Sequence, residues 1–390
     1  MPPAGSTGRF GLLPRRPRGA TPLGYAPPPP TPALIPDWIR AAGCSIIFSL
    51  MQNRFDEMMR LFLVPLSALG GKVADSTYFL RNDGGLAFAQ GYHHPPGMIS
   101  AKILYYPKKD GWADIHGRGY DCLHKSYRDG KMLSFTNPQQ IEMHYSLFPE
   151  LARRARVAPI IKNNLLMPLA DFAGFFDPRK SLRLCMGLYP KIDKGVRAAS
   201  ELLEVPLARM GLTGSLQYGR IEEHDDDTDI IIYGTVEENY ALMRRILSLV
   251  REDPARHVHE FGKFWPLRLY HGGILVCPFF VYAHESEIPL GGDCRILSLR
   301  PESIVEGRIT DIRHSIYMPL VFPLDAASVD GRREGSFILI LSDSYVRGEF
   351  EPGQRVRARG ELVEVEKGGR ATRAVIVANN WDVEKLPGNG

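Results

Sequence analysis

The sequence predicts an α+β protein in which helices and strands alternate in the middle of the chain and short strands dominate its C-terminal part. Three observations predict this class. Apolar residues recur at the spacing of one helix face over residues 192–207 and again over 235–252. The run Ile230–Tyr233 between them has the β-branched and aromatic composition of a strand buried on both faces. Short β-rich runs separated by Gly and Pro turns follow residue 300.

A chain of 390 residues exceeds a single typical core, so several domains are expected. Changes in composition along the chain divide it into five parts. These are a disordered Pro- and Arg-rich arm (1–35), a helical lead-in (36–74), an N-terminal α+β module (75–185), a central α+β core (186–300) and a small OB-like β-barrel (301–390). Residues 138–165 are expected to be helical, and residues 172–178 to form a loop.

The composition is that of a soluble globular protein, with 44% apolar and 24% charged residues. A net charge of +4 permits nucleic-acid binding but is too small to argue for it. No apolar run reaches about 18 residues, which argues against a membrane helix. The five cysteines are scattered and lack Cys-x-x-Cys pairs, so we expect reduced thiols and a cytoplasmic protein without a membrane partner.

The chemical signals coincide in one stretch. Gly214 and Ser215 lie in a turn of small residues after the first helical pattern, and Asp227 and Asp229 open the strand that follows. Side chains at positions i and i+2 of a strand point to the same face, so the two carboxylates are expected to project together. A second interpretation stays open, in which the acidic residues 222–226 form a solvated loop that leads into a core strand.

Two carboxylates directed at one point repel, and binding a cation relieves the repulsion. Oxygen ligands favour a hard ion, so the pair predicts a Mg²⁺ or Mn²⁺ site at Asp227 and Asp229. Gly214 lets backbone amides approach a phosphate closely, and the Ser215 hydroxyl adds a donor.

These residues resemble the DNA polymerase β-type nucleotidyltransferase superfamily, which carries Gly-Ser, a spacer and Asp-x-Asp on the next strand. The closer resemblance is to archaeal-type predicted nucleotidyltransferases, in which Gly-x-Thr-Gly-Ser and Ser-Asp-Ile-Asp-x-x-x-Tyr-Gly recur. Here Thr228 stands where Ile is usual. Similarity also covers the segments Gly91–Gly97, Ile103–Pro107 and Gly119–Lys125, and thus spans about residues 75–378.

The resemblance implies a polymerase β-type core and a transferase that moves a nucleoside monophosphate from an NTP to an acceptor, either nucleic acid or protein. Asp227 and Asp229 are then the catalytic metal ligands. Gly214 and Ser215 bind the terminal phosphates, and Arg220 offsets negative charge in the transition state.

The superfamily often carries a third carboxylate on a following strand. Here that strand, Ile274–Val281, contains no acidic residue, and Glu285 and Glu287 lie just beyond it. A catalytically inactive protein that binds nucleic acid or nucleotide is therefore the alternative function. A third acid near Asp227 and Asp229 would favour the enzyme, and a site without one beside a basic groove would favour the binding protein.

Arg355, Arg357 and Arg359 alternate along one predicted strand and therefore share one face. OB-like barrels often bind single-stranded nucleic acid through such a face, so these three arginines are a candidate nucleic-acid surface. An ordinary solvent-exposed face with alternating charge is the other interpretation.

Overall fold

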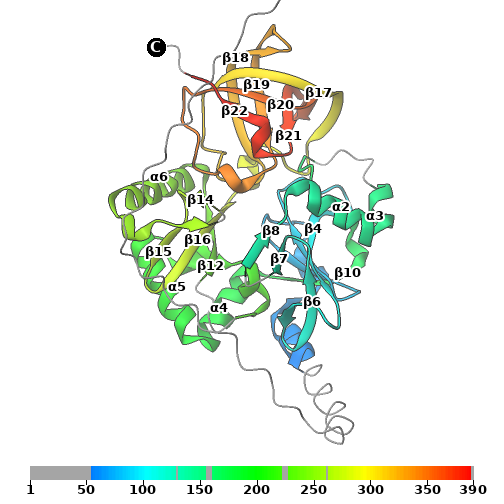
Figure 1. The fold of residues 1–390 in the computed structure, drawn as a ribbon, viewed down its shortest axis with the longest axis vertical. Coiled ribbons are helices and arrows are strands. Elements are labelled where there is room, and N and C mark those ends of the chain that lie inside the picture. The colour runs from blue at the N-terminus through cyan, green and yellow to red at the C-terminus, as the bar shows by residue number, and fades with distance from the viewer. Residues whose placement is uncertain (1–53, 129–130, 155–159, 222–226, 261, 388–390) are drawn as a thin grey trace, which may run out of the picture. The chain divides into compact units, whose positions relative to one another are not determined.

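The structure is a computed structural model that describes residues 54–128, 131–154, 160–221, 227–260 and 262–387. The predicted arm at 1–35 and much of the predicted lead-in at 36–74 lie outside these residues, and residues 54–62 of the lead-in are helical. The described chain is a mixed α+β protein composed mostly of strands, as the sequence predicts (Figure 1). The limits of the predicted domains stay predictions.

The N-terminal module is built on an eight-stranded sheet of order β1-β10-β2-β3-β4-β6-β5, with β9 paired to β4. A two-stranded hairpin, β7-β8, and two helices accompany it. The elements are β1 (Leu63–Val64), β2 (Tyr78–Arg81), β3 (Leu86–Ala89), β4 (Met98–Pro107), β5 (Ala113–Ile115), β6 (Arg118–Cys122), β7 (Lys125–Arg128), β8 (Lys131–Ser134), α2 (Asn137–Leu147), α3 (Pro149–Arg154), β9 (Leu165–Pro168) and β10 (Phe172–Phe176).

Two sequence predictions in this module are wrong in part. The helical prediction for 138–165 holds for α2 and α3, but Leu165 already begins strand β9. The loop predicted at 172–178 is strand β10, which lies between β1 and β2 in the sheet, followed by the start of a helix at Pro178. Gly174 lies where the backbone carbonyl of Val64 on the neighbouring strand approaches. An added Cβ there would lie 2.6 Å from that oxygen, so glycine serves strand packing at this position.

The central core contains a four-stranded sheet of order β11-β12-β16-β15, in which β12 and β16 run parallel. The connection between these two parallel strands contains helix α6, the short pair β13–β14 and strand β15. The elements are α4 (Pro178–Leu188), α5 (Pro190–Leu203), β11 (Met210–Leu212), the 3₁₀ turn η4 (Gly214–Tyr218), β12 (Asp227–Gly234), α6 (Val236–Glu252), β13 (His259–Glu260), β14 (Lys263–Phe264), β15 (Leu269–His271) and β16 (Ile274–Tyr282).

The two faces of this sheet differ in chemistry because side chains alternate along β12. Ile230 and Ile232 belong to a core shared with the apolar positions of α5 and α6, and Asp227 and Asp229 lie on the other face. Thr235 and Glu238 form a capping box at the start of α6. The Thr235 hydroxyl accepts from the Glu238 amide at 3.2 Å, and the Glu238 carboxylate accepts from the Thr235 amide at 2.8 Å.

The C-terminal part is a curled six-stranded sheet of order β17-β18-β19-β21-β20-β22. Strand β17 pairs with both β18 and β20, so the pairings of β17, β18, β19, β21 and β20 form a ring. The strands are β17 (Arg295–Ile309), β18 (Leu320–Val329), β19 (Arg332–Leu341), β20 (Arg355–Lys367), β21 (Arg370–Val377) and β22 (Val383–Lys385). Short 3₁₀ turns elsewhere are η1 (Leu66–Leu69), η2 (Leu169–Asp171), η3 (Leu207–Arg209), η5 (Pro254–Arg256), η6 (Glu285–Glu287), η7 (Ser344–Val346) and η8 (Asn380–Asp382).

Gln217, in the turn η4, joins the central core to the N-terminal sheet. Its buried side-chain carbonyl accepts from the Tyr78 amide at 2.9 Å, and its amide group donates to the Phe176 carbonyl at 2.9 Å. The Ser181 hydroxyl donates to the backbone oxygen of Gln217 at 2.6 Å. The same short turn that carries Gly214 is therefore fixed by strands β2 and β10 and by helix α4.

Gln217→Leu is expected to destabilise the protein, because it leaves two buried backbone groups without their partners. The expected loss in unfolding free energy is about 2–6 kcal/mol, since each of the two unsatisfied groups costs about 1–3 kcal/mol. Urea unfolding measures it. Gln354→Leu, in a partly exposed surface turn, is the control and should change stability by less than about 0.5 kcal/mol. Equal stabilities of the two variants would contradict the role of Gln217.

Within the described residues, no helix is both long enough and apolar enough to cross a membrane. Cys122, Cys185, Cys277 and Cys294 form no disulfides, as the scattered cysteines predict.

Candidate functional site

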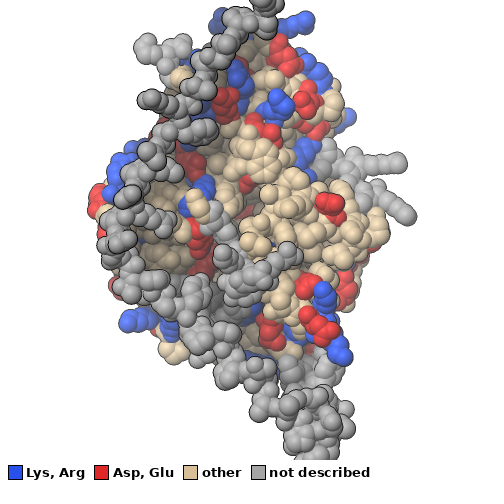
Figure 2. All heavy atoms as spheres, in the orientation of Figure 1, with Lys and Arg blue, Asp and Glu red and all other residues tan. Residues whose placement is uncertain are grey.

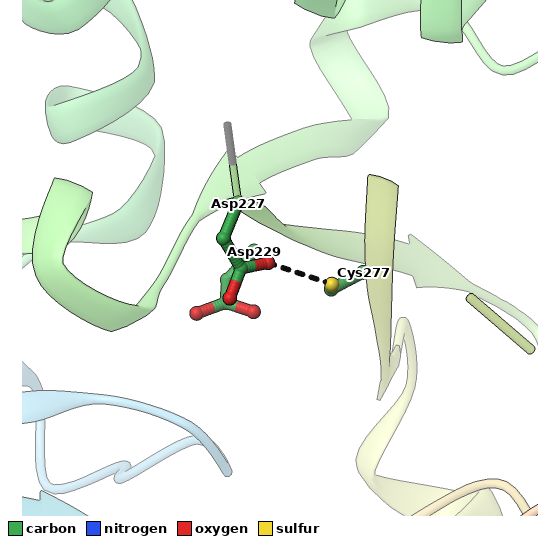
Figure 3. A group of neighbouring side chains, drawn as sticks. All are labelled: Asp227, Asp229 and Cys277. Carbon is green, nitrogen blue, oxygen red and sulfur yellow. Dashed lines mark hydrogen bonds between the residues drawn. The ribbon is translucent and has the colours of Figure 1, made fainter. Parts of the chain in front are cut away.

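The two predicted acids meet a third side chain that the sequence analysis did not single out. Asp227 and Asp229 lie on β12, and Cys277 lies on β16 directly opposite Asp229 in the parallel register. One ligand atom from each of the three lies within 4.8 Å of the others. The Cys277 thiol donates to Asp227 Oδ1 at 2.8 Å (Figure 3). Cys277 therefore occupies the strand on which a third carboxylate was expected.

The turn at Gly214 lies against the second acid. Gly214 has φ of 62°, in the left-handed region, and a Cβ on it would lie 2.0 Å from Asp229 Oδ2. The Thr213 amide donates to the Asp229 carbonyl at 3.0 Å, and the Thr213 hydroxyl donates to the Ser76 carbonyl at 2.7 Å. Ser215, the next residue of the turn, is partly exposed. Glycine is thus required at 214 both for backbone conformation and for the approach of the carboxylate.

Arg268 supplies a positive charge beside Asp227. It immediately precedes β15, which pairs with β16 in antiparallel register, so it lies next to Cys277 across the sheet. Its Nε donates to Cys277 Sγ at 2.8 Å, and a terminal nitrogen donates to Asp227 Oδ1 at 3.2 Å. The other terminal nitrogen pairs with Glu260. Burial would lower the pKa of Arg268, but Cys277, Asp227 and Glu260 together raise it above its ordinary value.

The Cys277 group is held as a neutral thiol. Burial, followed by the negative charges of Asp227 and Asp229, raises the pKa of Cys277 well above its ordinary value. The thiol accordingly accepts a hydrogen bond from Arg268 and donates one to Asp227.

The C-terminal sheet contributes Arg347, just after η7, to the same side of the core. Its guanidinium lies 4.9 Å from the centre of the Phe279 ring on β16. Burial lowers the pKa of Arg347, opposed by the attraction of Asp75, Cys277 and Asp229. Asp75 is buried in the N-terminal module, and burial raises the pKa of its carboxyl to about 6. Arg347 therefore adds a second buried positive charge near this face of the central sheet.

Arg220 is fixed by the N-terminal module. Its side chain is buried, and its Nε donates to the backbone carbonyl of Asp114 on β5 at 2.7 Å. Its charge also acts on the neighbouring Tyr218, whose pKa is raised by burial and lowered in part by Arg220. A role for Arg220 in binding phosphate stays a prediction.

Glu285 and Glu287, the acids just beyond β16, are engaged elsewhere. Glu285 pairs with Lys72 at 2.8 Å, and Glu287 accepts from the Val236 amide at the start of α6 at 3.0 Å. Among the residues that the structure describes, no third carboxylate joins the group formed by Asp227, Asp229 and Cys277.

The candidate nucleic-acid surface at the C-terminal sheet carries mixed charge. On β20, Arg357 pairs with Glu306 at 2.7 Å and with Glu384 at 3.2 Å, and Arg355 lies 3.9 Å from Glu306. Arg357 and Arg359 are exposed and Arg355 is partly exposed, with buried residues between them, so the three share the predicted face. Basic and acidic side chains are interspersed over this part of the molecule (Figure 2). A role in binding nucleic acid stays a prediction.

Comparisons with protein-family models, with curated proteins and with solved structures found no match for this chain. The function is therefore argued from the residues of the site themselves.

The donors at this site are suitable for a divalent cation. Two carboxylates on one strand face provide oxygen donors of the kind that hard divalent cations such as Mg²⁺ or Mn²⁺ prefer, and the neutral Cys277 thiol beside them is at most a weak donor. Gly214 keeps the space beside Asp229 Oδ2 free, which a Cβ would fill.

Proposed function

We propose that the chain is a metal-dependent nucleotidyltransferase, which moves a nucleoside monophosphate from an NTP to an acceptor. One observation carries this proposal. Two carboxylates project from one face of β12 to a point shared with Cys277, and the glycine turn before β12 lies directly against Asp229. A cation-binding pair beside a backbone turn without side-chain bulk is what transfer of a phosphate group needs.

In this function each residue has one role. Asp227 and Asp229 hold Mg²⁺ or Mn²⁺, which neutralises phosphate charge and orients the α-phosphorus for in-line attack. Gly214 allows close approach of the terminal phosphates to the backbone, and the Ser215 amide and hydroxyl donate to them. Arg220 offsets charge that develops on the phosphates during transfer.

The architecture supports the same proposal. We infer that the four-stranded sheet with its parallel β12–β16 pair is a polymerase β-type core, since the acids open one strand and the expected third position lies on its parallel neighbour. We infer that the C-terminal sheet is an OB-like barrel, since its ring of pairings joins five strands and includes the parallel pair β19–β21. The acceptor is then nucleic acid or protein.

The alternative function is a catalytically inactive protein that binds nucleotide or nucleic acid. The observation that favours it is Cys277, a neutral thiol in the position expected for a third carboxylate, with Arg268 paired to Asp227.

Transfer of label separates the two functions. Purified protein is incubated with NTPs labelled at the α-phosphate, with Mg²⁺ or Mn²⁺, and with cellular RNA and protein fractions. Label that becomes covalently attached to either fraction supports the transferase and identifies its acceptor class. Binding of the NTP without any attached label supports the inactive protein.

The arginine face on β20 gives a separate prediction. If Arg355, Arg357 and Arg359 bind a nucleic-acid backbone, affinity for single-stranded RNA should fall as salt rises, with a slope of about 0.7 per neutralised phosphate. Replacing all three by Gln should flatten that slope. Binding measured by fluorescence anisotropy over a range of salt concentrations tests this, and identical slopes for both proteins would show that the nucleic acid does not bind there.

A further inference from the structure

The guanidinium of Arg268 contacts two of the three candidate ligands, Cys277 and Asp227. We propose that the acid pair binds a single divalent ion, and that Arg268 permanently supplies the positive charge on the side of Asp227 and Cys277. This inference rests on the proposed function, because it specifies how the same metal site is charged.

The sheet register places the three groups side by side. Asp229 on β12 is opposite Cys277 on β16, and Arg268, which immediately precedes β15, is the next neighbour across the sheet. Arg268 donates to Cys277 Sγ at 2.8 Å and to Asp227 Oδ1 at 3.2 Å. A second ion bound to those same two atoms would have to displace the guanidinium. Figure 3 shows Cys277 and Asp227 directed toward each other, with Asp229 beside them.

Arg268 is held in place from its other side as well. Its second terminal nitrogen pairs with Glu260 on β13, and its guanidinium lies 5.5 Å from the centre of the Trp265 ring. Only 17% of its side chain is exposed. Moving it away would leave Glu260 without this partner in a partly buried position, so the guanidinium is a fixed part of the site.

The charges joined by these contacts balance with one ion. Arg268 pairs with the carboxylates of Asp227 and Glu260, and Asp229 is the third carboxylate beside them. Three carboxylates and one guanidinium group leave a net charge of −2, which one divalent ion neutralises. A second divalent ion would leave an excess of +2 beside a fixed guanidinium, which opposes its binding.

Titration of the full chain with Mn²⁺ tests the proposal without any assay of activity. Electron paramagnetic resonance measures free Mn²⁺ and therefore gives the number of ions bound per chain. The number bound at the site is the number bound by the wild type minus the number bound by the double variant with Asp227→Asn and Asp229→Asn. The wild type is expected to bind one ion in this way. Arg268→Met removes the charge and is expected to raise Mn²⁺ affinity at least about tenfold, or to admit a second ion.

Control variants test whether the effect depends on a positive charge at position 268. Arg256→Met removes an equally buried arginine, 20% exposed and paired with Asp253 at 3.0 Å, and should leave Mn²⁺ binding as in the wild type. Arg268→Lys keeps the charge and should also bind one ion. Arg268→Gln, which keeps a donor for Glu260, replaces Arg268→Met in the test if the methionine variant does not fold.

Three outcomes would overturn the proposal. The first is a wild type that binds two ions at the site. The second is a neutral variant, Arg268→Met or Arg268→Gln, that binds Mn²⁺ no more tightly than Arg256→Met does. The third is Arg268→Lys binding Mn²⁺ as the neutral variant does. No difference in bound Mn²⁺ between the wild type and the double asparagine variant would instead contradict the metal site and hence the proposed function itself.

Discussion

A protein with both Asp227→Asn and Asp229→Asn is expected to lose divalent-ion binding and nucleotidyl transfer together. The change removes both negative charges on the face of β12, so the site loses its oxygen ligands and the net negative charge that attracts a cation. Transfer should fall by at least about a thousandfold, because charge stabilisation by a bound metal contributes several kcal/mol. Calorimetric titration with Mn²⁺ and the label-transfer assay measure the two losses.

Stability serves as the control for this double variant. Neighbouring like charges repel in the folded protein, so their removal should leave the melting temperature unchanged or raise it. Asp193→Asn with Asp253→Asn is the matched comparison, since each of these acids is also paired with an arginine, Arg197 and Arg256 respectively, but lies away from β12. Unchanged Mn²⁺ binding in the Asp227 and Asp229 double variant would refute the metal site.

The parts of the site that the sequence predicts are those fixed by local geometry. Asp227 and Asp229 share a face because side chains alternate along any strand, and Thr235 with Glu238 forms a capping box because both lie within one helical turn. The hairpin around Gly272 and Gly273 likewise follows from the turn residues, and β15 and β16 pair there.

The parts that could not be predicted depend on how separate strands pair. Residues 274–277 are Ile, Leu, Val and Cys, a strand buried on both faces, so no alternation of polar and apolar residues shows which side Cys277 faces. Its contact with Asp227 follows only from the register between β12 and β16. Arg268 lies beside β15, one strand further from β12 than Cys277 does. Its position therefore also depends on the register between β15 and β16.

Contacts between distant parts of the chain are a further limit. Arg347 lies far along the sequence from the acid pair, and Ser76 contacts the Gly214 turn by accepting from the Thr213 hydroxyl. Neither residue belongs to a local motif.

Gly214→Ala is expected to abolish NTP binding and to weaken Mn²⁺ binding strongly. The new Cβ would lie 2.0 Å from Asp229 Oδ2, so the carboxylate must move away from Asp227, and the φ of 62° adds backbone strain. Ser215→Ala should have a smaller effect, weakening NTP binding by about 1–3 kcal/mol while leaving Mn²⁺ binding unchanged, because it removes one hydrogen bond to a charged phosphate.

The variant Gly353→Ala distinguishes the steric clash with Asp229 from the backbone strain of a positive φ. Gly353 has φ of 85° with no atom within 4 Å of an added Cβ, so its substitution carries the conformational cost alone, about 1–2 kcal/mol of stability. Thermal melts and NTP titrations are compared across the three variants. One outcome would contradict the phosphate site: Gly214→Ala loses only as much stability as Gly353→Ala, and both Gly214→Ala and Ser215→Ala bind NTP like the wild type. Residues 213–219 would then form a tight turn without a phosphate site. If Gly214→Ala folds but binds neither ion nor NTP, the position is required because the backbone there must lie against Asp229.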